Sequence, residues 1–240
     1  MIVRDVAAGV EVFLLRRVAT MAFAPSVLVF PGGGVDVCDA DPSLPWAGPS
    51  PMEWAIRMGC SELAARELVV AAVREVFEEC GVLLAGSDED YVLGDVSGPQ
   101  WRAERDALVT KATSLAQLLI RRDLVLRSDL LSVRSHWVTP AFEPRRYSTW
   151  VFAAVLPPGQ VADDRTSEAD MAQWSAPAEV LRGYRDGSLL MLPPTVVSME
   201  HLAAAPSVAA LVAEQPAVLP IEPALVRVGD ELVLRADLPV

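Results

Sequence analysis

Hydrophobic and polar positions along the chain follow patterns that predict strands first and helices later. Val10 to Leu15 and Ser26 to Phe30 are apolar, β-branched runs of strand length. The second run ends at Pro31-Gly32-Gly33-Gly34, a sequence typical of a turn. The first predicted feature is therefore a strand that leads into a glycine-rich loop.

A polar stretch rich in proline follows this loop. Residues 37 to 61 contain Pro42, Pro45, Pro49 and Pro51. This composition predicts an inserted loop, with one helical turn around Met52 to Met58. Long loops of this kind often shape functional sites.

The clearest helix is predicted from Glu62 to Cys80. Ser61 is suited to cap its N-terminus, and Gly81 is suited to end it in a left-handed conformation. At about 100 degrees per residue, one side of this helix gathers valines, Phe77 and Cys80. We interpret Cys80 as a packing residue. The opposite side gathers the charged residues Glu67, Arg74, Glu75, Glu78 and Glu79.

The rest of the chain alternates between further helices and strands. The predicted elements are a helix from Gln100 to Arg121, a strand from Tyr147 to Leu156, a helix after Pro177, an Ala-rich helix from Pro193 to Glu214, and two short strands from Ala224 to Leu234 around Gly229-Asp230. We predict a main domain over residues 1–180 and an extension over residues 181–240. The extension is expected to pack on the domain or at a dimer interface.

Composition narrows the class of function. A chain of 240 residues that is 52% hydrophobic can bury a full core. Its net charge of −12 argues against a nucleic-acid-binding surface and suits a bound cation. Three cysteines without CxxC spacing and two histidines indicate neither a disulfide framework nor a zinc site. With no run approaching about 18 apolar residues, we expect a cytoplasmic protein with no membrane or nucleic-acid partner.

The predicted Glu62 to Cys80 helix carries the candidate chemistry. Glu75, Glu78 and Glu79 share one face, and like charges so close raise one another's pKa. A cation would relieve this repulsion, and Mg²⁺ prefers such hard oxygen ligands. Taken alone, a solvated helix face with Arg74 paired to Glu78 is the more common explanation. That explanation leaves the upstream glycine loop without a role.

Together the glycine loop and the acidic helix resemble the Nudix family. Its sequence box is G, five residues, E, seven residues, then R-E-U-x-E-E-x-G-U, where U is aliphatic. The second half is matched by Arg74, Glu75, Val76, Glu78, Glu79, Gly81 and Val82, and the glycine end by Phe30 to Gly33. An insert changes the spacing between the halves. The first box glutamate therefore has two candidate positions, Asp39 counted from Gly33, or Arg66 with its neighbour Glu67 counted from Arg74.

The resemblance implies a fold, a cofactor and a reaction. The fold class is α/β (α+β), a Nudix α/β/α sandwich with a mixed sheet, an inserted loop within the box and a C-terminal helical extension. Magnesium, with Mn²⁺ as an alternative, would be held by Glu75, Glu78, Glu79 and the carbonyl of Gly33. Arg74 would orient the glutamates, and Arg74 and Glu75 count as catalytic. The implied reaction is attack of a metal-activated water on a diphosphate phosphorus.

Many Nudix enzymes carry another glutamate on a loop after the box, often a few residues before a tryptophan. Glu168 lies shortly before Trp174 and is the candidate base, with Asp170 in reserve. A surface carboxylate beside Asp163 and Asp164 is an equally good interpretation of Glu168.

Other segments resemble the Nudix branch that includes peroxisomal coenzyme A diphosphatases. They are Leu14 to Arg17, Met21 to Pro25, His136 to Pro140, Pro144 to Tyr147 and Leu192 to Thr195. The resemblance makes coenzyme A or acyl-CoA candidates among nucleoside diphosphate derivatives. Arg16, Arg145 and Arg146 are candidate phosphate-binding residues. Surface arginines, one of them paired to Glu143, are the alternative for the last two.

Two features limit how far the resemblance to coenzyme A diphosphatases can be carried. The coenzyme A signature of another Nudix branch is not reproduced between Arg16 and Gly34. Relatives usually begin the first strand earlier, so that strand is short or Met1 is an internal start. The expected partner is a small nucleotide substrate, with a homodimer as a further expectation.

Two functions from other classes explain less of the sequence. A catalytically inactive Nudix-fold module that binds or senses a nucleotide would not need three mutually repelling carboxylates. A scaffolding domain explains neither the glycine loop nor the acidic face. The leaving group stays open, because discrimination between diphosphates depends on pocket shape.

Overall fold

A mixed seven-stranded sheet forms the centre of the molecule. The computed structural model describes residues 1–20, 24–166 and 169–238. The strand order is β10-β7-β8-β1-β2-β3, with β9 also paired to β2. The strands are β1 (Ile2–Val6), β2 (Gly9–Arg17), β3 (Leu28–Val29), β7 (Leu131–Val138), β8 (Ser148–Val155), β9 (Ala169–Ser175) and β10 (Pro220–Ile221). β1 runs parallel to β8 and β10 parallel to β7, and the other pairs are antiparallel.

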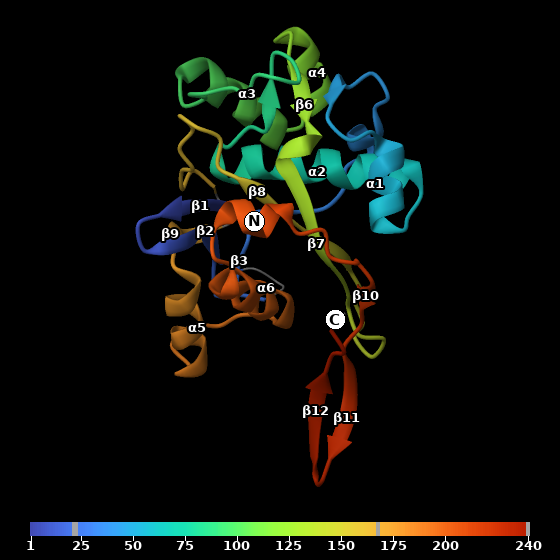
Figure 1. Cartoon of the computed structure of the whole chain (residues 1–240), viewed down its shortest axis with the longest axis vertical. Helices are drawn as coiled ribbons and strands as arrows, with labels where there is room; N and C mark the ends of the chain where they lie inside the picture. The colour runs from blue at the N-terminus through green and yellow to red at the C-terminus, as the bar shows by residue number, and fades with distance from the viewer. Residues whose placement is uncertain (21–23, 167–168, 239–240) are drawn as a thin grey trace.

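Helices cover both faces of this sheet (Figure 1). Ile2 and Phe13 belong to one hydrophobic cluster and Val3 and Leu14 to another, because consecutive strand residues point to opposite faces. The first cluster includes residues of α1 (Pro51–Met58), α2 (Glu62–Cys80) and α4 (Leu115–Arg121), and the second includes residues of α5 (Pro177–Arg185), α6 (Pro193–Ala204) and α7 (Val208–Ala213). The predicted α/β/α sandwich with a mixed sheet is confirmed.

α2 begins and ends where the sequence predicts. The Ser61 hydroxyl accepts a hydrogen bond from the Ala64 N–H at 3.2 Å. Gly81 has a φ of 72° and donates its N–H to the Phe77 carbonyl at 3.0 Å. Because both ends are fixed by local hydrogen bonds, the register of every side chain along α2 is fixed as well.

A second layer covers α2 on the side away from the main sheet (Figure 1). It contains α3 (Pro99–Val109), α4 and a small sheet of order β4-β6-β5. The strands of this sheet are β4 (Trp46–Ala47), β5 (Ala85–Gly86) and β6 (Val125–Arg127). α2 therefore lies between two layers.

Two helices predicted as single elements are each broken in two. The predicted helix Gln100 to Arg121 is α3 followed by α4, because Lys111 has a φ of 57° and Ser114 caps a new helix. The predicted helix Pro193 to Glu214 is α6 followed by α7, because a proline interrupts it and Ser207 accepts a capping hydrogen bond. No helix in the described ranges is both long and apolar enough to cross a membrane.

The proline-rich segment 37–61 is more ordered than the predicted loop. It contains the short 3₁₀ helix η1 (Val37–Ala40), β4 and α1. α1 has 8 residues rather than one turn, and its Ser50 N-cap accepts from the Glu53 N–H at 3.3 Å. Trp54 on α1 is 1% exposed and packs in the same cluster as α2. The insert is therefore part of the core.

The last residues form an arm rather than a further layer. β11 (Ala224–Val228) and β12 (Glu231–Arg235) pair only with each other, around the predicted turn at Gly229-Asp230. This hairpin projects from the body (Figure 1). The division of the chain at residues 180 and 181 stays a prediction.

Candidate active site

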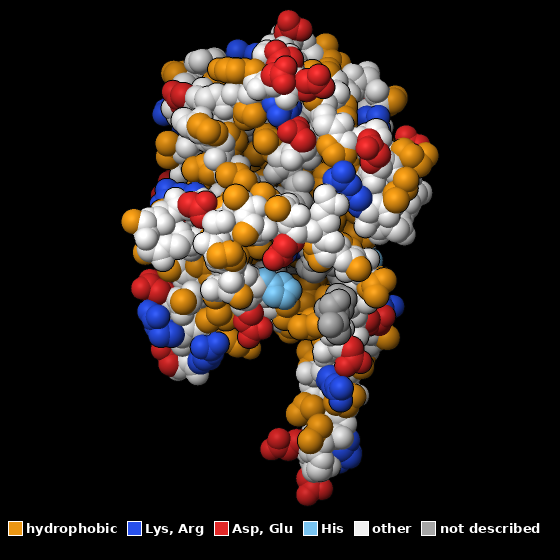
Figure 2. All heavy atoms as spheres, in the orientation of Figure 1, with side chains coloured by type: hydrophobic (Ala, Val, Ile, Leu, Met, Phe, Trp, Pro, Cys, Tyr) orange, Lys and Arg blue, Asp and Glu red, His pale blue; other side chains and the backbone are white. Residues whose placement is uncertain are grey.

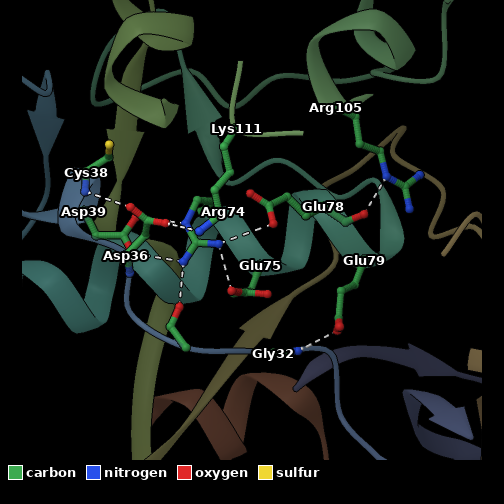
Figure 3. Close-up of polar contacts among 11 residues, drawn as sticks. Gly32, Asp36, Cys38, Asp39, Arg74, Glu75, Glu78, Glu79, Arg105 and Lys111 are labelled. Atoms are coloured by element: carbon green, nitrogen blue, oxygen red, sulfur yellow. Dashed lines mark hydrogen bonds and ion pairs between the residues drawn. The ribbon is translucent and has the colours of Figure 1, made fainter. Parts of the chain in front are cut away.

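Arg74 is the centre of a polar network on α2 (Figure 3). Its Nε and Nη2 donate to the two carboxylate oxygens of Asp39, both at 2.9 Å. Nη2 also donates to the Gly34 carbonyl at 2.8 Å, and Nη1 donates to Glu75 at 2.7 Å and to Glu78 at 3.3 Å. Burial disfavours the charge of Arg74, but Asp39 and Glu75 outweigh that effect and raise its pKa. The guanidinium is therefore fixed in position and always charged.

Asp39, one of the two candidates for the first box glutamate, is the one that contacts Arg74. It is 1% exposed and lies in η1, directly after the glycine loop. Its Oδ2 also accepts the Asp36 N–H at 2.7 Å, which closes a capping box. Glu67 is not among the partners of Arg74. Of the two candidate positions, the one counted from the glycine loop is therefore the one whose side chain contacts Arg74, and its equivalence to the first box glutamate stays a prediction.

Glu75 and Glu78 share the guanidinium of Arg74 and are largely buried. Their side chains are 12% and 15% exposed. Burial raises the pKa of both above the usual value for glutamate, and Arg74 opposes the rise by pairing with both. One guanidinium thus faces Asp39, Glu75 and Glu78, and the excess negative charge is what a bound cation would neutralise.

The glycine-rich loop at residues 32–36 is tied at both ends. The Gly32 N–H donates to the Glu79 carboxylate at 2.7 Å. At the other end, Asp36 forms an ion pair with Lys111 at 2.5 Å, and this contact lowers the pKa of Asp36 to about 2. Figure 3 shows Lys111 extending toward the loop from above α2. The loop is therefore held across the acidic face of the helix.

Gly33 is the point where this loop comes closest to the acidic side chains. A Cβ placed on Gly33 would lie 2.6 Å from the carboxyl carbon and from both oxygens of Glu75. Such a contact is too short for any side chain, so only glycine allows the backbone to approach this carboxylate without displacing it. The structure therefore brings together the predicted ligands Gly33 and Glu75.

The residues present fit magnesium by their donor chemistry. Glu75, Glu78 and Glu79 offer carboxylate oxygens, which Mg²⁺ prefers. Because Gly33 has no side chain, the Glu75 carboxylate can lie close to the loop backbone. In the described ranges, no three His, Cys, Asp or Glu side chains converge as a ready metal site. Instead, Glu75 and Glu78 point to Arg74, and Glu79 points to Gly32. Metal binding by these glutamates stays a prediction.

Arg16 and the reserve candidate Asp170 lie together on the paired strands β2 and β9. Arg16 Nε donates to Asp170 Oδ1 at 2.7 Å, and both side chains are 42% exposed. They line a hollow of about 370 Å³ together with Ser26, Leu28 and residues 188–190. Glu168 and the segment Met21 to Phe23 lie outside the described residues.

Arg145 and Arg146 lie in the β7–β8 turn, well separated from α2 (Figure 1). Arg146 Nη2 pairs with Glu222 at 2.6 Å, and its Nε donates to the Thr139 carbonyl at 2.9 Å. Arg146 is therefore an exposed arginine paired with Glu222, and the pairing of one arginine with Glu143 stays a prediction. The structure does not bring either arginine to the glutamates of α2, so their role with phosphate stays a prediction.

Arg105 is a residue of this region that the sequence patterns did not identify. It is 6% exposed, and its Nε donates to the Glu78 carbonyl at 2.8 Å. Its other nitrogens donate to Asp163 at 2.6 Å and to the Arg165 carbonyl at 3.0 Å. Arg105 thus joins the last turn of α2 to the segment that precedes Glu168. No local motif marks it, because its partners are mainly backbone carbonyls distant in sequence.

Cys80 is expected to resist thiol reagents while the protein is folded. Its side chain is fully buried, and burial raises its pKa to about 12, whereas Cys38 is exposed. Mass spectrometry after brief treatment with an alkylating reagent should find Cys38 modified and Cys80 unmodified. In denaturant, both should react. Rapid native-state modification of Cys80 would contradict its packing role.

A family model described as the NUDT19 Nudix domain matches residues 60–202, which is more than half of the chain. Putative nudix hydrolase 7 of Caenorhabditis elegans is 28% identical over 192 residues, covering 80% of this chain and 55% of that protein. The acyl-coenzyme A diphosphatases NUDT19 of Xenopus laevis and Homo sapiens are 25% and 28% identical, covering 80% and 82% of this chain. The matches span 59% and 61% of those two proteins.

A solved structure also resembles this chain along most of its length. The crystal structure of a NUDIX hydrolase from Alicyclobacillus acidocaldarius superposes with a TM-score of 0.73 at 26% sequence identity. The match covers 89% of this chain and 92% of the other. The sandwich fold expected from the sequence is therefore found in an experimentally determined relative.

Proposed function

Because this chain belongs to the NUDT19 Nudix domain family, we propose that it is a magnesium-dependent hydrolase of a diphosphate linkage in a small nucleoside diphosphate derivative. The observation that carries this proposal is the Arg74 network. One buried guanidinium positions Glu75 and Glu78 on the face of α2 that the glycine loop crosses. A nucleotide-sensing role alone would not require this density of buried carboxylates.

The chain's own residues supply position and charge. Asp39 fixes Arg74, and Arg74 holds Glu75 and Glu78 in place. Glu79 holds the start of the glycine loop through the Gly32 N–H. Bound by Glu75, Glu78, Glu79 and the Gly33 carbonyl, magnesium would neutralise phosphate charge and lower the pKa of a water molecule. We propose Glu168 as the base that takes the proton from the attacking water, with Asp170 in reserve.

Acyl-coenzyme A is the substrate class that we propose. Two relatives named acyl-coenzyme A diphosphatase match about four fifths of this chain. The chain spans about 55–61% of the length of the curated relatives it matches. Arg16 lines the hollow described above and pairs with Leu28 of β3, the strand before the glycine loop, and we propose that it binds phosphate.

Turnover of a diphosphate panel tests this function. The panel should include acyl-CoA, free coenzyme A, ADP-ribose and a dinucleoside polyphosphate, with products separated by mass. We expect hydrolysis in Mg²⁺, loss of hydrolysis in excess EDTA, and recovery when Mg²⁺ or Mn²⁺ is returned. Tight nucleotide binding without turnover of any panel member would instead establish the sensor function.

A further inference from the structure

The β11–β12 arm exposes apolar side chains that nothing in the described chain covers. Leu225, Leu232 and Leu234 are 47%, 62% and 48% exposed. They share one face of the hairpin, because Leu225 pairs with Leu234 and Leu232 pairs with Arg227. Figure 2 shows hydrophobic atoms along this arm below the body. A two-stranded hairpin is marginally stable by itself in water, so an arm of this kind gains from further pairing.

Among the strands of the described residues, none pairs with the outer edge of β12. A two-residue turn at Gly229-Asp230 connects β11 to β12, and the φ of 62° at Gly229 suits a turn with glycine at its first central position. Because hydrogen-bonded and non-hydrogen-bonded pairs alternate from that turn, the backbone groups of Leu232 and Leu234 point away from β11. These outward-pointing donors and acceptors, which no described strand pairs with, can accept another strand.

The sequence of β12 is complementary to itself in the antiparallel direction. It reads Glu231-Leu232-Val233-Leu234-Arg235. When two copies of this strand pair around Val233, each Glu231 lies opposite an Arg235, and each Leu232 lies opposite a Leu234. Opposite charges and apolar pairs directly across strands are the stabilising arrangements in antiparallel sheets.

We propose that β12 is a dimerisation strand that pairs with β12 of a second copy of this chain. The two hairpins then form a four-stranded antiparallel sheet around a two-fold axis, with the leucines of both copies on one face. The contact is isologous, which is the usual geometry of homodimers. Glu231 has no ion-pair partner in the described ranges, and Arg235 has only Asp237 at 3.4 Å, with both side chains mostly exposed.

The charges favour β12 over β11 and a second copy over an unrelated partner. If β11 paired with itself around Val226, Leu225 would lie opposite Arg227, and no opposite charges would meet. Shifting the register of β12 by one residue removes the Glu231 to Arg235 pairing. Only the β12 pairing around Val233 satisfies both charge and apolar complementarity.

Proline substitutions on the two edges test the contact. Leu234 and Leu225 are cross-strand partners with nearly equal exposure, and their N–H groups point to opposite edges. Leu234→Pro should weaken the dimer by roughly 30-fold or more, because it removes two inter-copy hydrogen bonds across the symmetric contact. Leu225→Pro, the matched control, should leave the dimer intact. Sedimentation equilibrium of the full chain over a wide concentration range measures both.

Charge exchange provides an independent test. Glu231→Arg and Arg235→Glu should each weaken self-association, because each places like charges opposite one another. An equimolar mixture of the two variants should restore association as a heterodimer, and the double variant should restore the homodimer. The proposal is overturned by a wild-type chain that is monomeric throughout, by equal effects of the two proline variants, or by a mixture that stays monomeric. Hydrolysis is not needed for any of these measurements.

Discussion

Glu78→Gln and Glu79→Gln are each expected to lower kcat by on the order of 10²- to 10⁴-fold, since losing a metal ligand removes several kcal/mol of transition-state stabilisation. Glutamine keeps the size of the side chain and removes the charge. Glu67→Gln, on the same helix but outside the Arg74 network, is the matched control and should retain turnover. Steady-state rates on the best panel substrate, measured over a range of Mg²⁺ concentrations, give the comparison.

Thermal unfolding of the same variants separates chemistry from folding. Burial raises the pKa of both Glu75 and Glu78, and the charge of Asp39 raises both further. Neutralising Glu78 removes one of two closely placed charges, so the glutamine variant is expected to unfold near the wild-type temperature. Full turnover by both the Glu78→Gln and the Glu79→Gln variant would refute metal binding by this helix.

Asp39→Ala is expected to lower the free energy of unfolding by about 3–5 kcal/mol, the usual loss when one partner of a buried ion pair is removed. Asp39 is 1% exposed and holds Arg74 through two hydrogen bonds. Without Asp39, the Arg74 guanidinium loses the carboxylate partner that accepts two of its hydrogen bonds, and it keeps single hydrogen bonds to Glu75 and to Glu78. Urea unfolding followed by circular dichroism measures the difference.

An exposed ion pair supplies the comparison for Asp39. Arg146 and Glu222 pair at 2.6 Å with side chains 45% and 44% exposed. Glu222→Ala should therefore change stability by less than about 1 kcal/mol. If Asp39→Ala cost no more than Glu222→Ala, Arg74 would not depend on Asp39, and the proposed positioning role would be wrong.

The parts of the site that sequence predicts are those fixed by local rules. The bounds of α2 follow from Ser61 and Gly81, whose hydrogen bonds lie within one turn. The shared face of Glu75, Glu78 and Glu79 follows from helical periodicity alone. Both predictions require only residues that are close in sequence, and the structure agrees with both.

The sequence patterns missed strands and site residues whose position depends on contacts between segments distant in sequence. β7 carries Arg134, Ser135 and His136 among its apolar residues, and β9 is mostly half-buried. Neither strand shows the apolar run that identified β2 and β8, because their pairing is set by neighbouring strands. Arg105 reaches the Glu78 carbonyl across 27 positions, so no spacing rule distinguished it from a surface residue. Asp39 was one of two candidates from spacing, and its contact with Arg74 across 35 positions became visible only in the structure.

The 34 residues between Asp39 and Arg74 bear on how strictly the site depends on chain length. The entropy of closing a loop grows with the logarithm of its length, and a doubling costs only about 0.6 kcal/mol. A bidentate buried pair outweighs that cost as long as Asp39 stays next to the glycine loop. The contact between Asp39 and Arg74 therefore does not require a fixed number of residues between them, although here the intervening segment also contributes Trp54 to the core. A search that requires fixed spacing between glycine and arginine will miss chains built in this way.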